Sequence, residues 1–292
     1  MADRAEPDYR GVLSSPVTLR GGAMAVARWT LRPLFRRWAF WLIVALGAIG
    51  FLTNFALIYI KAEIAVQNVQ LANFLDRFRV TGTGEAYRDF LRFQARAVIL
   101  MLAYVGVAAL ANDYRAGGVA FYLARPIGRR HYILGKSLAL AAILALLTLV
   151  PGLLLFIAYG VFANSPEYWW EEWRLARGIV GYSLVIMTVP SVLLVALSTV
   201  LRRSAPLLLV WTAIFIILPA LGFWMSQVLR GRGWNLVSLW YDLGVVGQLG
   251  FGALRNEADR PFVPVAAGIL VFVVAGSLIA IVRNLRAVEV VQ

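Results

Sequence analysis

The stretch 128–137 contains the one arrangement in this chain that suggests nucleotide chemistry, a glycine followed later by Gly-Lys-Ser. A Walker-type phosphate loop has four residues between its first glycine and the Gly-Lys pair, so that backbone N–H groups surround the phosphates. Here six residues separate Gly128 from Gly135. No strand pattern precedes the stretch, and a long apolar run follows it. We therefore reject a nucleotide site and predict that Lys136 anchors the end of a membrane span.

Other residues that catalyse reactions or bind metals are scarce in this sequence. Cysteine is absent, which removes disulfide, thiol-nucleophile and zinc–thiolate chemistry, and His131 is the only histidine. The only tight acidic pair, Glu171-Glu172, lies among tryptophans, and we interpret it as solvated. We predict no catalytic, metal-binding or cofactor-binding residue and no enzyme activity in this chain.

Residues 112–136 form a charged, glycine-broken segment between two long apolar runs. Gly117 and Gly118 permit a sharp entry, and Pro126 ends any helix that precedes it. Residues 119–123 are therefore expected to form one or two helical turns, with apolar side chains between basic flanks. Such a short helix is suited to a groove in a partner. The alternative is an ordinary basic loop on the cytoplasmic side of a membrane protein.

Composition points to a membrane protein. Apolar residues make up 61% of the 292 residues and charged residues only 15%, which is typical of an all-α polytopic membrane protein. The net charge of +13 could also indicate a nucleic-acid ligand. However, the arginines cluster at the ends of apolar runs, where membrane topology requires them, so we predict no nucleic-acid binding.

Six apolar runs are expected to cross the bilayer, each needing roughly 20 residues. The second is short and is extended by Arg96, whose long side chain can reach the interface. Before the first run, Arg28, Arg32 and Arg36 recur every four residues and predict an interfacial amphipathic helix, which Pro33 kinks or divides. The chain is thus divided into 1–37, a tail plus this helix, and 38–292, the transmembrane domain. The predicted spans are 38–60, 97–111, 138–163, 178–201, 205–229 and 262–282.

An even number of spans places both termini on one side of the membrane. Lys and Arg are more numerous in the termini and in the loop 112–136 than in the loops 61–96 and 230–260. The positive-inside rule therefore predicts cytoplasmic termini. No cleavable signal is visible in 1–37, so we expect insertion through the first span.

The predicted outer loops carry structure of their own. Residues 64–78 and 87–93 have apolar residues at helical spacing and predict two amphipathic helices on the outer leaflet. The aromatic residues at 168–173 are expected to anchor the outer interface, with stacking on a sugar or nucleobase as the weaker alternative. The loop 230–260 is apolar but rich in glycine, and we predict a re-entrant hairpin there, with a surface loop as the alternative.

The segment 112–136 resembles the signature loop of the ABC type-2 transporter permease family. The resemblance rests on a helix that ends at an acid, a turn of the form leucine, small residue, arginine, proline, and a Gly-Lys pair that opens the next span. In this chain the matching residues are Asp113, Arg115 and Gly117, then Leu123, Ala124, Arg125, Pro126 and Ile127, then Arg129, Tyr132, Gly135 and Lys136.

This resemblance implies the membrane subunit of an ABC exporter in the plasma (inner) membrane of a bacterium or archaeon. ATP and Mg would bind a separate cytosolic ATPase subunit, two permease copies would form the pathway, and membrane lipids would surround them. The loop would act as a coupling helix. The residues expected to dock on the ATPase, or to pair with its acids or lipid phosphates, are Asp113, Arg115, Val119, Tyr122, Leu123, Arg125, Pro126, Ile127, Arg129 and Arg130.

Two other functions stay open at this point. A non-transporting membrane anchor or assembly factor could use the same loop to hold a soluble partner. An ion-coupled secondary carrier usually keeps ionisable residues inside its spans, and the predicted span interiors contain none. The polar residues there are serines, threonines and one asparagine, which favour an amphipathic or hydrophobic cargo over an ion.

Overall fold

The computed structural model describes residues 18–64, 82–111, 129–162, 167–201, 203–252 and 254–289. Within these ranges every regular element is a helix, and six helical stretches are long and apolar enough to cross a membrane. The prediction of an all-α, six-span membrane protein is therefore confirmed. The spans are Trp38–Ala62, Gly84–Ala108, His131–Phe162, Trp173–Leu201, Ser204–Val228 and Glu257–Asn284.

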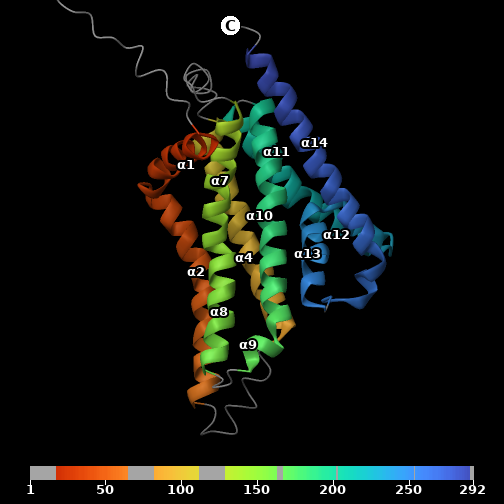
Figure 1. Cartoon of the computed structure of the whole chain (residues 1–292). Helices are drawn as coiled ribbons and strands as arrows, with labels where there is room; N and C mark the ends of the chain where they lie inside the picture. Colours follow the sequence, from red (N-terminus) through yellow and green to blue (C-terminus); the bar gives the residue numbers. More distant parts are fainter. Residues whose placement is uncertain are drawn as a thin grey trace, which may run out of the picture.

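The helices form one bundle, in which α1 and the C-terminal end of α14 lie at the same end (Figure 1). We call this end the terminal end and the other end the distal end. The first three spans are α2 (Trp38–Tyr59) with the π-helical η1 (Ile60–Ile64), α4 (Gly84–Val105) with η4 (Gly106–Ala111), and α7 (Arg129–Leu147) with α8 (Leu149–Phe162). The last three are α10 (Trp173–Leu201), then α11 (Ser204–Thr212), η5 (Ala213–Ile217) and α12 (Leu218–Val228), and finally α14 (Val263–Glu289).

Helix α10 is the centre of the bundle and contacts α4, α7, α8, α13 and α14. Its inward face is fully buried at Ile179, Tyr182 and Leu194. In contrast, α2 leaves large apolar side chains such as Leu42, Ile49 and Leu52 more than half exposed. An exposed apolar surface of this kind is the side of a span that faces hydrocarbon.

Two spans are interrupted next to a proline. The break between α7 and α8 falls at Thr148, three residues before Pro151, and the π-helical η5 precedes Pro219. A proline has no N–H and its ring crowds the carbonyl four residues earlier, so the preceding turn must widen or break. Helix α10 continues without interruption through Pro190.

The second span begins earlier than predicted, and this corrects one call. Residues 87–93 are not a separate amphipathic helix on the outer leaflet but the first turns of α4. Thr83 caps the helix, because its Oγ1 accepts a hydrogen bond from the Ala86 N–H at 3.4 Å. The polar start of α4 packs against α10, and Arg88 is buried there. Protein therefore surrounds the Arg88 side chain. Apart from Ile64, the other predicted outer helix, 64–78, lies outside the described residues.

The N-terminal helix α1 (Leu19–Phe35) runs across the terminal end of α7 (Figure 1). Pro33 lies inside the helix and does not divide it; α1 instead ends before Arg36 and Arg37. One face, including Val26 and Leu34, is buried, while the opposite face exposes Trp29. This two-faced pattern is the one predicted, and its placement in the bilayer interface stays a prediction.

The predicted outer segment 230–260 is helical. It contains the 3₁₀ turn η6 (Arg232–Val237), α13 (Leu239–Gln248), and the 3₁₀ turns η7 (Leu249–Phe251) and η8 (Glu257–Phe262). Helix α13 packs against α10 and α14. A Cβ atom on Gly247 would lie 1.9 Å from a ring carbon of Tyr182, so only glycine allows this close approach. The alternative of an irregular surface loop is wrong, and the re-entrant position relative to the bilayer stays a prediction.

Candidate functional site

Most of the predicted docking residues cannot be placed. Asp113, Arg115, Val119, Tyr122, Leu123, Arg125, Pro126 and Ile127 lie outside the described residues. Arg129 and Arg130 form the first turn of α7, and only their backbone is described. The helices that flank the segment are both described: η4 ends at Ala111 and α7 begins at Arg129, at the terminal end of the bundle (Figure 1).

Helix α7 is held tightly against α1 at the C-terminal end of the segment 112–136. A Cβ atom on Gly135 would lie 2.5 Å from Val26 Cβ and 2.6 Å from the Ala23 carbonyl oxygen. One turn earlier, a Cβ atom on Gly22 would lie 2.5 Å from a ring carbon of His131. The two helices thus touch backbone to backbone through glycines, as closely packed membrane helices do. A displacement of the start of α7 must therefore move α1 as well.

Lys136 lies on the same part of α7 and is buried, with 3% of its surface exposed. Its ammonium nitrogen is 5.7 Å from the centre of the Tyr132 ring, and Tyr132 is also buried. A cation over an aromatic face is stabilised by the ring quadrupole. Lys136 therefore holds the first turns of the third span inside protein, and it takes no part in a phosphate loop.

The exposed side of α1 carries both charge and apolar surface. Arg28 and Arg32 line a hollow of about 630 Å³ together with Met24, Phe35 and Leu138. The Trp29 side chain is 68% exposed. Arginine and tryptophan side by side on an exposed helix face are typical of the boundary between headgroups and acyl chains.

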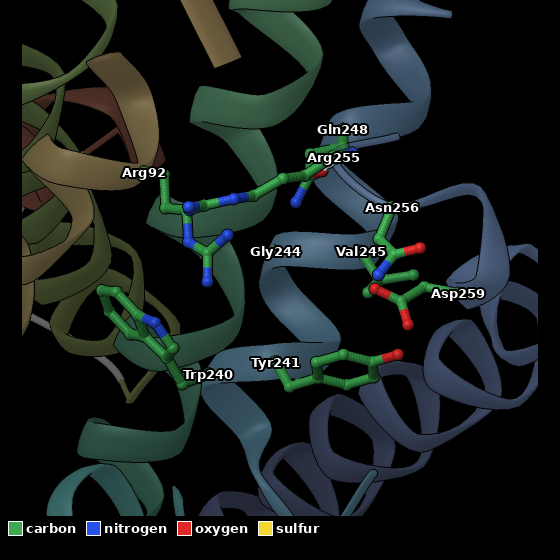
Figure 2. A pocket seen from close by; sticks show the side chains of 9 residues that line it. All are labelled: Arg92, Trp240, Tyr241, Gly244, Val245, Gln248, Arg255, Asn256 and Asp259. Carbon is green, nitrogen blue, oxygen red and sulfur yellow. Dashed lines mark hydrogen bonds between the residues drawn. The ribbon is translucent and has the colours of Figure 1, made fainter. Parts of the chain in front are cut away.

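A second hollow lies at the distal side of α10. It has a volume of about 370 Å³ and lies between α4 and the α13 segment (Figure 2). Two arginines, an aspartate and two aromatic side chains face it. The lining residues are Arg92, Trp240, Tyr241, Gly244, Val245, Gln248, Arg255, Asn256 and Asp259.

A family model described as ABC-2 family transporter protein matches residues 24–232, which is more than half of the chain and contains most of α1, five of the six spans and the segment 112–136. The chain belongs to the ABC-2 family of transporter proteins. It is therefore a multi-pass membrane permease of the ABC transporter class. No curated protein shows significant similarity to the chain.

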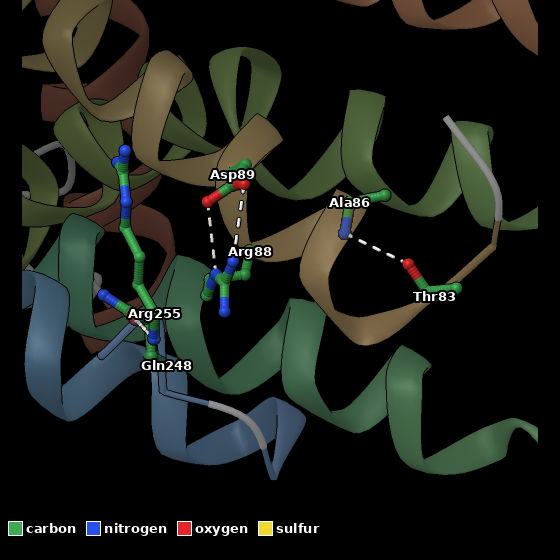
Figure 3. Close-up of polar contacts among 6 residues, drawn as sticks. All are labelled: Thr83, Ala86, Arg88, Asp89, Gln248 and Arg255. Atoms are coloured by element: carbon green, nitrogen blue, oxygen red, sulfur yellow. Dashed lines mark hydrogen bonds and ion pairs between the residues drawn. The ribbon is translucent and has the colours of Figure 1, made fainter. Parts of the chain in front are cut away.

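In this ABC-2 permease the start of α4 holds a buried charge. The Arg88 side chain is 1% exposed, and its Nε donates to Asp89 Oδ1 at 3.1 Å (Figure 3). A second, longer hydrogen bond of 3.4 Å joins Arg88 Nη2 to Asp89 Oδ2. Asp89 is 42% exposed, so the pair links the interior to the distal surface. An arginine in a buried position needs such a carboxylate, because desolvating a lone guanidinium is costly.

We predict that Asp89→Asn destabilises the permease by about 1–3 kcal/mol, because the buried Arg88 loses the negative charge of Asp89. The expected result is a melting temperature several degrees lower in detergent. Glu257→Gln is the matched control, since Glu257 is 66% exposed and pairs with Arg260, which is itself exposed. Equal melting temperatures for Asp89→Asn and Glu257→Gln would show that the Arg88–Asp89 pair does not stabilise the fold.

A buried carboxyl group lies on α13, outside the six spans. Asp242 is completely buried, and neither of its carboxylate oxygens has a hydrogen-bond partner among the described residues. Burial raises the pKa of the Asp242 carboxyl to about 7, because desolvation disfavours its charged form. This group is therefore neutral in mildly acidic solution and charged in alkaline solution.

An aromatic cluster closes the distal end of the bundle near α9 (Tyr168–Glu171). The hydroxyls of Tyr87 and Tyr168 are 3.1 Å apart, and the Tyr168 ring packs on Phe156 and Tyr159. Burial raises the pKa of Tyr168 to about 12. Trp170, in contrast, is 83% exposed. Of the aromatic residues at 168–173 that were predicted to anchor the interface, the tryptophans face outward, while Tyr168 belongs to the protein interior.

Sequence reasoning missed the distal hollow and the buried carboxyl group. Sequence analysis places Arg92 in an outer amphipathic helix, and Arg255 and Asp259 in the predicted re-entrant segment 230–260. The signal that could have found them is the run Arg88, Arg92, Arg96 at a spacing of four, which puts three arginines on one face of a continuous helix. Among the described residues, no three His, Cys, Asp or Glu side chains gather in a group that could hold a metal ion.

Proposed function

We propose that the chain is the permease subunit of an ATP-driven exporter, and that it couples to a separate cytosolic ATPase subunit through residues 112–136. ATP and Mg bind the partner. The chain lies in the plasma (inner) membrane of a bacterium or archaeon, with both termini in the cytoplasm, and two copies form the pathway. Family membership supports the permease role, and the concentration of Arg and Lys at the terminal end supports the orientation.

The observation that carries the coupling proposal is the glycine contact between α7 and α1. The segment 112–136 joins the second span to the third, and its last residues, including Gly135, belong to α7. Because Gly135 touches Val26 and the backbone of Ala23, a force applied to the loop reaches α1 directly. A force on the N-terminal end of the loop reaches η4, which contacts α10 and α11. A moving ATPase could thus shift two spans and the interfacial helix together.

Within this proposal each part of the loop has a role. Val119, Tyr122, Leu123 and Ile127 fill a groove on the ATPase, and Pro126 ends the short helix that carries the first three. Asp113 and Arg115 fix the entry of the loop. Arg125, Arg129 and Arg130 pair with acids of the ATPase or with lipid phosphates. The cargo favoured by the weakly polar span interiors is an amphipathic or hydrophobic molecule.

Deletion of residues 119–123 should abolish stimulation of ATP hydrolysis and transport while leaving membrane insertion unchanged. The experiment purifies the permease from native membranes, identifies the co-purified ATPase, and measures both activities in vesicles. Leu249→Ala is the matched control: Leu249 is an exposed leucine at the distal end, and its loss should change neither activity.

The outcomes separate the candidate functions. An ATPase that co-purifies with the wild type and is lost with the deletion supports coupling through the loop. Unchanged stimulation in the deletion variant would overturn the docking role. Retention of a soluble partner without any ATP-dependent transport would favour a membrane anchor, and transport by the chain alone in an ion gradient would favour a secondary carrier.

A further inference from the structure

Two arginines from distant parts of the chain face the same distal hollow. Arg92 lies on α4, in the second span, whereas Arg255 lies between η7 and η8, just before the last span. Both side chains line the hollow of about 370 Å³, and Figure 2 shows both guanidinium groups on the same side of it, above Trp240. Two positive charges are thus brought together by the fold and not by sequence proximity.

No carboxylate within the described ranges forms an ion pair with either of these arginines. The nearest acids are already engaged: Asp259 accepts from Arg232 at 3.1 Å, and Asp89 accepts from Arg88 at 3.1 Å. The remaining ion pair of this region joins Arg260 to Glu257. Arg92 and Arg255 therefore repel each other across the hollow, and Asp89 offsets this repulsion only in part. An anion between the two guanidinium groups would remove it.

The surroundings hold Arg255 in place. The Gln248 side chain, only 4% exposed, accepts a hydrogen bond through Oε1 from the Arg255 backbone N–H at 2.8 Å (Figure 3). The next residue, Asn256, caps η8 by accepting from the Ala258 N–H at 3.1 Å. The backbone of Arg255 and of the residue after it is therefore held by side-chain hydrogen bonds.

The size of the hollow and the side chains that line it indicate which class of ligand it can bind. Its volume falls within the usual range for small-molecule pockets and exceeds that of one phosphate ion. Guanidinium groups bind phosphate oxygens through paired N–H donors. Trp240 and Tyr241 add aromatic wall, which suits the apolar part of a larger molecule. A phosphate group attached to a small apolar body matches all three properties.

We propose that this pocket is a phosphate-binding site, in which Arg92 and Arg255 hold a phosphate group between them. The group is supplied by the headgroup of a phospholipid-like molecule or by free phosphate. The site goes beyond the proposed coupling to an ATPase, because its residues lie at the other end of the bundle. The ligand binds to the permease in the absence of the ATPase.

Equilibrium binding to the purified full-length permease in neutral detergent tests this proposal. The probes are inorganic phosphate, dihexanoyl phosphatidic acid, and dihexanoylglycerol as the phosphate-free comparison. The variants are Arg92→Gln, Arg255→Gln and the double substitution. Arg260→Gln is the matched control, because Arg260 is an exposed arginine in the same segment that does not line the pocket. Gel filtration and melting curves report whether each variant is folded.

We expect saturable binding of phosphatidic acid and no saturable binding of dihexanoylglycerol. Each single substitution should weaken binding about tenfold or more, as expected for loss of one charge-assisted contact. Arg260→Gln should bind like the wild type, and added salt should weaken binding in all folded proteins. Binding of inorganic phosphate as well would identify the phosphate itself as the recognised group. Binding of phosphatidic acid without binding of inorganic phosphate would show that the glycerol and acyl part is recognised together with the phosphate.

Equal affinities of the wild type and the folded double variant would overturn the proposal, and so would the absence of saturable binding for both phosphate probes. Because Arg255 is exposed, Arg255→Gln should remain folded even if Arg92→Gln does not. Neither result depends on the ATPase. Failure of this site and failure of the coupling proposal are thus distinguished by separate measurements.

Discussion

Gly135→Leu is expected to detach α1 from α7 and to abolish stimulation of ATP hydrolysis by the permease. The Cβ atom alone would lie 2.6 Å from the Ala23 carbonyl oxygen, and this backbone atom cannot rotate away. Val26 Cβ, at 2.5 Å, is equally fixed to its helix. The remaining atoms of leucine need space that a buried, closely packed crossing does not contain. The helices must therefore separate, at a cost of about 3 kcal/mol or more.

The measurement has two parts. The melting temperature in detergent should fall by about 5–10 °C, and trypsin should cut α1 at Arg28 faster than in the wild type. Gly268→Leu is the matched control, because a Cβ atom at Gly268 meets no other atom within 4 Å and faces open space on α14. Rapid proteolysis in both variants would point to a general effect of leucine. Unchanged proteolysis in Gly135→Leu would show that the crossing tolerates a larger residue.

This variant also tests the coupling proposal in a way that the loop deletion does not. Gly135 lies on α7, so the residues 119–123 and their apolar side chains remain intact. If the ATPase still co-purifies but its activity is no longer stimulated by the permease, the loop is sufficient for docking. The α1–α7 contact is then needed to transmit the movement. If the partner is lost as well, the position of α7 is itself needed for docking.

The spans were predictable because the bilayer imposes a simple rule on sequence. A stretch of about 20 apolar residues is a span whatever its neighbours, and each of the six predicted runs overlaps a span of the structure. The second span begins at Gly84 and not at Ala97, because the charged residues before Ala97 belong to the same helix α4. Arg88 instead reaches the protein interior with Asp89 as its partner, and no periodicity reveals that neighbour.

The contacts that hold the bundle together were not predictable from the glycines that form them. In the sequence, Gly135 belongs to the Gly-Lys pair that opens the third span, and Gly247 is one of several glycines in 230–260. In the structure both are close contacts between helices. Which helix approaches a glycine depends on the packing of the whole bundle. The distal pocket could not be predicted for the same reason, since it forms only where the packing brings Arg92 of α4 close to Arg255. The docking residues of the loop came from a motif and stay a prediction.

We expect the wild type to become less stable as the pH rises above neutral, and we expect Asp242→Asn to abolish this dependence on pH. The folded-state pKa of Asp242 is about 7, whereas the unfolded carboxyl has a pKa near 3.8. Between these values the folded protein binds more protons than the unfolded one, so stability falls as the pH rises through this window. Below pH 3.8 the contribution is fully present, and above about pH 8 it is lost. The burial of Asp242 makes the size of the effect on the order of 2–4 kcal/mol.

Melting curves at pH 5.5 and pH 8.5 measure this effect. The wild type should melt several degrees lower at pH 8.5, and Asp242→Asn should melt at the same temperature at both, because its amide has the shape of the carboxyl but no charge. Glu257→Gln removes an exposed carboxylate and should keep the wild-type slope. If the melting temperature of Asp242→Asn still falls between pH 5.5 and pH 8.5, the group that titrates is not Asp242. A flat wild-type profile would mean that the Asp242 carboxylate finds compensation in the folded protein, for example from a cation that enters beside α13.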